Sequence, residues 1–252
     1  MFYQIRSYIY MKIKMIFICS ILILSSCATE EKNLNTPEGQ FEQAMEYKKS
    51  GRFEIAISKM TDIKNKYPYN SISVDSKLAI ADIQFEREDY AEAQLAYQNF
   101  RDFHPKHAKT DYVIYQTAMS YYNQLPDTFD RDLSLGNDAI YHFDEIIKSY
   151  GESKYSADSK IKRTDVFNHL AEKELYVADF YFKQKKYSSA LRRYELCLSK
   201  YSGFGFDPRA HLGALESAVA LNDMTKKAYH LKQLTSKYPQ AKETIEAESV
   251  SK

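Results

Sequence analysis

The sequence predicts an all-α protein in which pairs of helices stack one after another. First, the eighteen-residue segment EDYAEAQLAYQNFRDFHP, at Glu88–Pro105, recurs with other side chains at four other places. Second, the chain has only seven Gly and six Pro, and no Pro lies inside a run with helical spacing. Third, it has no Trp but 22 Tyr and 14 Phe, whose rings suit the seams between helices. These observations favour one extended stack of repeats over two separate cores.

The recurring segment has the apolar spacing of an amphipathic helix. Its apolar positions lie three or four residues apart, at Tyr90, Ala93, Tyr97 and Phe100. Pro105 follows the run and ends the helix, because Pro lacks an N–H and clashes with the preceding turn. The small Ala on the same face allows a second helix to approach closely.

Five helix pairs follow from these recurrences. The step from Gly51 to Glu88 is 37 residues, close to the roughly 34 residues of a tetratricopeptide repeat. We therefore predict a right-handed tetratricopeptide-repeat superhelix over residues 38–240. Its repeats are expected at about 38–70, 71–107, 108–151, 155–202 and 207–240.

The predicted helices are, in chain order, Glu38–Ser50, Phe53–Lys66, Val74–Arg87, Tyr90–Phe103, Asp111–Tyr122, a helix within Ser134–Gly151, Ser156–Lys183, Tyr187–Lys200, Pro208–Leu221 and Met224–Lys237. Gly51 occupies the first turn, where a positive φ costs little. Residues 124–136 break the helical period, so we predict a loop inside the third repeat. Lys227 replaces the Ala of the other repeats, which is typical of a terminal cap. We expect residues 241–252 to be a frayed C-terminal tail.

The N-terminal residues have the layout of a signal peptide. Lys12 and Lys14 precede an almost wholly apolar run that ends at Leu24, too short to span a bilayer stably. Leu24-Ser25-Ser26-Cys27 resembles the lipobox of bacterial lipoproteins. We therefore predict a lipoprotein signal peptide at 1–26 and a lipidated tether at 27–37, with a covalent diacylglyceryl and N-acyl lipid on Cys27.

Ala28 follows this cysteine in place of the Asp that marks retention in the inner membrane, which favours the periplasmic face of the outer membrane. An ordinary signal peptide with an incidental Cys is the alternative. Whether Met1 or Met11 is the start stays open.

Composition and motifs argue against nucleic-acid binding, metal binding and catalysis. The formal net charge is +1, so no strong field attracts a polyanion. The six His are scattered, which disfavours a metal site, and no cofactor is expected. Gly-rich phosphate loops, zincin motifs and Gly-flanked Ser elbows are missing from the sequence. Cys197 occupies a core position of the recurring segment, where a packed thiol is expected. We predict that the protein is not an enzyme.

Tandem repeats behind a lipidation site resemble the BamD family, the tetratricopeptide-repeat lipoproteins of the β-barrel assembly machinery. The motifs that carry the resemblance are Tyr67-Pro68-Tyr69, Asp111-Tyr112-Val113-x-Tyr115, Asp130-Arg131-Asp132, Ser153-x-Tyr155-x-x-Asp158 and Val177-Ala178-x-x-Tyr181. The sequence departs from the family at the start of the fourth repeat's second helix, where the aromatic is Tyr187 and Lys185 replaces a Gly.

This resemblance implies two binding regions. The C-terminal repeats would bind the periplasmic module of the barrel-forming subunit, with Arg193, next to Arg192, at the contact. The N-terminal repeats would receive unfolded outer-membrane proteins in a groove near Tyr67 and Tyr69. From the residues alone, a solvated helix face is the alternative for the arginines, and packing is the alternative for the aromatic rings.

The charged residues of the insertion, Asp130, Arg131 and Asp132, form either a structural brace or a docking edge. The expected function is therefore a non-catalytic outer-membrane scaffold that docks the barrel-forming subunit and recruits unfolded outer-membrane proteins. The alternative is a periplasmic tetratricopeptide-repeat lipoprotein that serves as an adaptor for peptidoglycan enzymes.

Overall fold

A computed structural model describes residues 33–250, and within them every regular element is a helix. The helices are α2 (Pro37–Lys49), α3 (Phe53–Lys66), α4 (Ser71–Glu86), α5 (Tyr90–Phe103), α6 (Thr110–Asn123), α7 (Leu135–Ser149), α8 (Ser156–Lys183), α9 (Tyr187–Lys200), α10 (Asp207–Ala220), α11 (Met224–Lys237) and α12 (Lys242–Val250). The predicted signal peptide, Cys27 and most of the tether lie outside the described residues.

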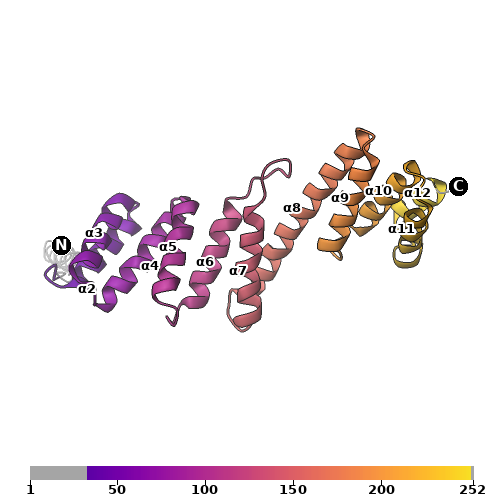
Figure 1. The fold of residues 1–252 in the computed structure, drawn as a ribbon. Coiled ribbons are helices and arrows are strands. Elements are labelled where there is room, and N and C mark those ends of the chain that lie inside the picture. The colour runs from indigo at the N-terminus through magenta and orange to yellow at the C-terminus, as the bar shows by residue number, and fades with distance from the viewer. Residues whose placement is uncertain (1–32, 251–252) are drawn as a thin grey trace, which may run out of the picture.

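The helices form one elongated row, with α2 at one end and α12 at the other (Figure 1). Each helix from α2 to α11 packs against its neighbours in the chain. The first helices of successive repeats also touch, α2 with α4, α6 with α8, and α8 with α10. The all-α stack of helix pairs is therefore confirmed, and the first helices share one layer.

The recurring segment supplies the buried seam of each pair, as predicted. Ala56, Ala93, Ala139 and Ala190 are completely buried in the second helices. The larger side chains that follow on the same faces are also buried, namely Met60, Ile63, Tyr97, Phe100, Phe143, Ile146, Tyr194 and Cys197. The fifth pair differs, because α11 buries His230 and Leu234. Gly213 of α10 lies against the Tyr194 ring, where a Cβ would come within 2.3 Å of it.

Two aspartates connect helices of adjacent repeats with the same spacing. Asp82 of α4 accepts hydrogen bonds from Tyr97 and Tyr112, each at 2.8 Å. Asp179 of α8 accepts from Tyr194 at 2.6 Å and from Arg209 at 2.5 Å. In both sets the donors follow the aspartate by 15 and 30 residues, counted as 97 − 82 and 112 − 82, and as 194 − 179 and 209 − 179. One carboxylate thus joins both helices of its own repeat to the first helix of the next repeat. We call these two sets the aspartate clusters.

The third repeat contains the predicted insertion, which connects α6 to α7. α8 begins and ends at the predicted residues, Ser156 and Lys183. The prediction of a frayed tail is wrong for residues 242–250. They form α12, which buries Thr244 and Ala247 against α10 and α11. Apolar spacing gave little sign of this helix, because its larger apolar residue, Ile245, is 70% exposed and the buried one is a small Ala.

Four helix pairs share one turn geometry. The second residue after the first helix has positive φ, at Gly51 (73°), Glu88 (64°), Lys185 (57°) and Asn222 (57°). The next residue donates its N–H to a carbonyl five positions back, as in Asp89 to Gln84 and Lys186 to Tyr181. This is a Schellman ending, which favours Gly because a Cβ is strained at positive φ.

Replacing Lys185 by Gly should therefore stabilise the protein by about 0.5–1 kcal/mol, since the strain of the Cβ exceeds the extra entropy of Gly in the unfolded chain. Urea denaturation followed by circular dichroism measures the difference. Asn222→Gly is the matched control and should gain less, because Asn tolerates this region better. A loss of stability in Lys185→Gly would contradict the strain argument.

Candidate functional site

Three adjoining pockets lie along the first helices of repeats one to three and the start of α8. One of about 600 Å³ lies beside α2, one of about 450 Å³ lies between α4 and α6, and one of about 440 Å³ lies at α6 and the start of α8. The first two share Lys48 and Glu86, and the last two share Asp82 and Tyr112. We call these three pockets together the N-terminal groove.

The side chains that line the N-terminal groove change from apolar to charged along its length. At the α2 end, Phe41 and Met45 present apolar surface. In the middle, Lys48 forms an ion pair with Glu86 at 3.2 Å, so these charges offset each other. At the far end, Lys109 and Lys154 are exposed beside the ring of Tyr155. Asp82 and Asp111 line the same far pocket. The groove therefore offers an extended peptide apolar surface at one end and side chains of both charges at the other.

The side chains of Tyr112 and Tyr155 line this groove. The pKa of Tyr112 is raised, first by burial and then by the charge of Asp82. Its hydroxyl therefore stays protonated and keeps donating to Asp82. Tyr115 and Tyr155 stack with ring centroids 4.7 Å apart, and Tyr115 donates to Asp158 at 2.5 Å. Hydrogen bonds from Tyr112 and Tyr115 thus connect the third repeat to its two neighbours.

Tyr67 and Tyr69 lie in the turn between α3 and α4 and do not line the N-terminal groove. Tyr69 is fully exposed. Tyr67 is half-buried, with the Lys66 ammonium 5.3 Å from its ring centroid. Their role in binding stays a prediction.

Arg193 lies on α9 and reaches back to α8. Its Nη1 donates to Oε2 of Glu174 at 2.9 Å. The side chain of Arg193 is 37% exposed, whereas that of Glu174 is 17% exposed. A guanidinium has five N–H donors in a planar fork, so this one bond leaves others for a second carboxylate. Arg192 is exposed on the same helix.

The insertion is attached to α8. Leu133 is buried, Phe129 packs on Tyr176 with ring centroids 5.4 Å apart, and Lys173 donates to the carbonyl of Arg131 at 2.6 Å. Asp132 accepts from the backbone N–H and the hydroxyl of Ser134, both at 2.9 Å. These contacts hold the insertion against α8, as expected of a structural brace. The side chains of Asp130, Arg131 and Asp132 remain exposed, so a docking role also stays open.

Hydrogen bonding lowers the pKa of two carboxyls in the insertion. For Asp130 the first cause is the bond with Thr128, and for Asp132 it is the backbone bond from Ser134. Both side chains are therefore negative at neutral pH.

Within residues 33–250, no group of three or more His, Cys, Asp or Glu side chains is arranged to hold a metal ion. Cys197 is buried, and burial raises the pKa of its thiol to about 12, so the thiolate that nucleophilic chemistry needs is scarce. No helix in this range is both long and apolar enough to cross a membrane.

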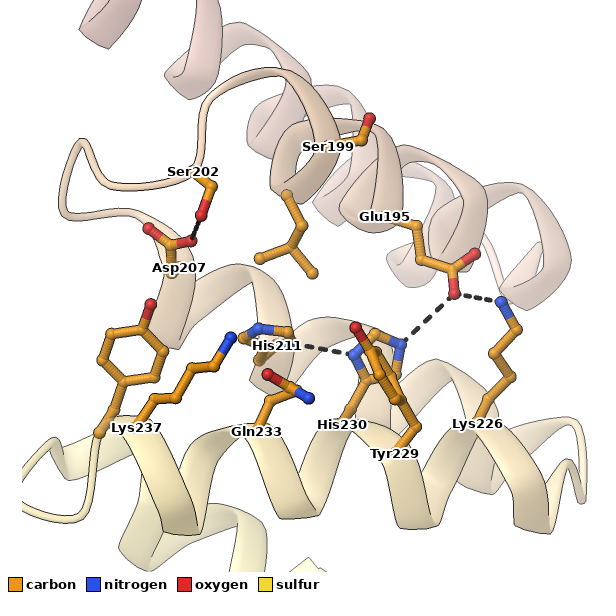
Figure 2. Close-up of a pocket in the computed structure, with 12 residues that line it drawn as sticks. Glu195, Ser199, Ser202, Asp207, His211, Lys226, Tyr229, His230, Gln233 and Lys237 are labelled. Carbon is orange, nitrogen blue, oxygen red and sulfur yellow. Dashed lines mark hydrogen bonds and ion pairs between the residues drawn. The ribbon is translucent and has the colours of Figure 1, made fainter.

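Two features escaped the sequence reasoning. The aspartate clusters could have been found, because the 15-residue spacing from Asp to its donors occurs twice. The contact between His211 and His230, in a pocket between α9, α10 and α11 (Figure 2), has no such signal. It depends on how two helices are packed.

Comparison with known proteins assigns the family. Residues 34–231 match the YfiO family, described as an outer membrane lipoprotein. The chain belongs to the YfiO family. The match includes both helices of the first four repeats, α10 and part of α11.

Relatives within the YfiO family carry a common name. The chain is 25% identical to the outer membrane protein assembly factor BamD of Neisseria meningitidis serogroup A, over 71% of this chain and 74% of that protein. It is 29% identical to the BamD of Rickettsia prowazekii, over 76% of each. It is 26% identical to that of Vibrio cholerae, over 62% of this chain and 69% of that protein.

Proposed function

We propose that this protein is a non-catalytic outer-membrane protein assembly factor that holds a barrel-forming subunit and recruits unfolded outer-membrane proteins to it. The match of residues 34–231 to the YfiO family carries this proposal, supported by relatives named as assembly factors. In this proposal a lipid on Cys27 anchors the chain to the periplasmic face of the outer membrane.

The N-terminal groove is the proposed site for unfolded clients. An outer-membrane protein that has not yet folded is an extended chain with exposed apolar side chains. The apolar end at Phe41 and Met45 suits such side chains, and Lys109 and Lys154 suit a carboxylate.

The surface around Arg193 is the proposed contact for the barrel-forming subunit. Glu174 holds the Arg193 side chain in one position, so little conformational entropy is lost when a partner binds. A carboxylate of the subunit would then accept hydrogen bonds from the remaining N–H groups.

Arg193→Glu should reduce recovery of the barrel-forming subunit at least about tenfold, because it places a carboxylate where the partner's carboxylate binds and beside Glu174. The measurement is affinity capture from detergent-solubilised membranes with mass identification. Arg192→Glu, the same charge reversal one residue away, shows whether the neighbouring arginine also belongs to the contact. Undiminished recovery with Arg193→Glu would contradict the contact. Recovery of peptidoglycan enzymes in place of a barrel-forming subunit would favour the adaptor alternative.

Met45→Glu should weaken binding of a fluorescent peptide from the C-terminal strand of an outer-membrane protein by about tenfold, since burying roughly one apolar side chain contributes about 1.5 kcal/mol. Fluorescence anisotropy gives the dissociation constants. Tyr69→Ala tests the other candidate client site, the exposed ring at the α3–α4 turn. If Tyr69→Ala loses binding and Met45→Glu does not, the client site lies at the α3–α4 turn.

Cys27→Ala should leave unprocessed precursor in the inner membrane, because the acyl chains that anchor the protein can no longer be attached. Membrane fractionation and the apparent mass of the chain provide the measurement. Ser26→Ala is the neighbouring control and should fractionate normally. Outer-membrane fractionation of Cys27→Ala at the mature mass would refute lipidation.

A further inference from the structure

Two buried histidines are in contact at the interface between the two helices of the fifth repeat. His211 of α10 and His230 of α11 place their Nδ1 atoms 2.9 Å apart, at the wall of a pocket of about 310 Å³ (Figure 2). His211 is 6% exposed and His230 is 1% exposed. The contact therefore lies inside the interface between α10 and α11.

The distance between the Nδ1 atoms defines the protonation state. At 2.9 Å, one Nδ1 must carry a hydrogen and the other must accept it. If either imidazole becomes doubly protonated, it remains a donor. If both do, two N–H groups face each other and the hydrogen bond is lost. This geometry holds at most one extra proton.

Charged groups surround the pair from several helices. Glu195 of α9 lies with Oε1 3.5 Å from His230 Nε2, but the same oxygen is in an ion pair with Lys226 of α11. Asp207, at the start of α10, accepts from Ser202 at 2.5 Å and from the N–H of Gly203 at 2.8 Å. The acidic groups nearest the histidines are thus already engaged.

Other charges near these helices do not neutralise the histidines. Lys237 of α11 extends towards His211 and adds positive charge (Figure 2). On α8, Asp179 is bound to Tyr194 and Arg209. On α12, Glu246 acts on Glu216 of α10, whose pKa is raised first by burial and then by that charge.

The pKa of both imidazoles is lowered as a result. Burial is the largest cause for each, and His230 adds to it for His211, whose pKa falls to about 4. Glu195 acts in the opposite direction on His230 without reversing the shift. Both histidines are therefore neutral in the packed state at neutral pH.

We propose that the His211–His230 pair is a proton-responsive joint, and that protonation of the pair loosens α11 and α12 from α10. This inference does not depend on the proposed function. α12 is included because it packs on both α10 and α11.

The direction of the effect follows from proton binding. When α11 detaches, each imidazole reaches water and regains a pKa near 6.5, so the open state binds more protons below that pH. Stability of the packed joint is full above pH 6.5 and is lost as pH falls towards 4. For His211 alone, a change from 6.5 to about 4 favours the open state about thirtyfold at pH 5.

Hydrogen exchange of the full chain tests the joint. After correction for intrinsic rates, backbone amides of α11 should exchange at least about tenfold faster at pH 5 than at pH 7.5, whereas those of α5 should not. The double variant His211→Gln with His230→Gln should lose most of this pH dependence. His107→Gln, in the turn between α5 and α6, is the matched control and should keep it.

Imidazole nitrogen resonances of the unmodified protein provide a second measurement that needs no variant. The two Nδ1 atoms should show one donor and one acceptor at pH 7.5, and both histidines should titrate at a lower pH than an imidazole in water, because burial lowers both pKa values. Ordinary titration of both near 6.5 would overturn the proposal. Unchanged pH dependence of exchange in the double variant would do the same.

Discussion

Close approach of the two helices in each pair is the constraint on which the stack depends. A completely buried Ala marks the crossing in the first four pairs, at Ala56, Ala93, Ala139 and Ala190. With a larger side chain there, the helices would separate and the rings of Tyr97, Phe143 and Tyr194 would lose their packing partners. The aromatic residues can be large because the Ala is small. A small residue also makes room for a large one at the contact between repeats four and five, where Gly213 lies against the ring of Tyr194.

Local patterns predicted nearly all of this fold, because a repeat protein is built from contacts between neighbouring segments. Phe53–Lys66, Tyr90–Phe103 and Ser156–Lys183 are helices with the predicted bounds. α12 was missed because it is held by Ala247 and Thr244, which give no apolar period. The candidate site was less predictable. The groove combines side chains from several repeats. Met45 and Lys154 are far apart in the sequence, so no local pattern shows that they lie along one surface.

The two proposed binding regions differ in how their charges are arranged. In the N-terminal groove, Lys48 is matched by Glu86, so apolar surface at Phe41 and Met45 dominates that end. At repeat four, Arg193 is fixed by Glu174 but retains unused donors. The first arrangement favours chains recognised by their apolar side chains. The second favours one folded partner with a carboxylate in a defined position. The net charge of the chain is only +1, so selectivity between the two kinds of partner would come from how charged side chains are paired within each region.

The aspartate clusters connect the repeats at two of the four junctions of the stack. Asp82 couples repeat two to repeat three, and Asp179 couples repeat four to repeat five. At the equivalent positions of repeat one the residues are Met45 and Met60, which cannot form this cluster. Its junction relies on apolar packing and on ion pairs such as Lys48 with Glu86. The first repeat is therefore joined to the second without the directional hydrogen bonds by which Asp82 and Asp179 connect later repeats.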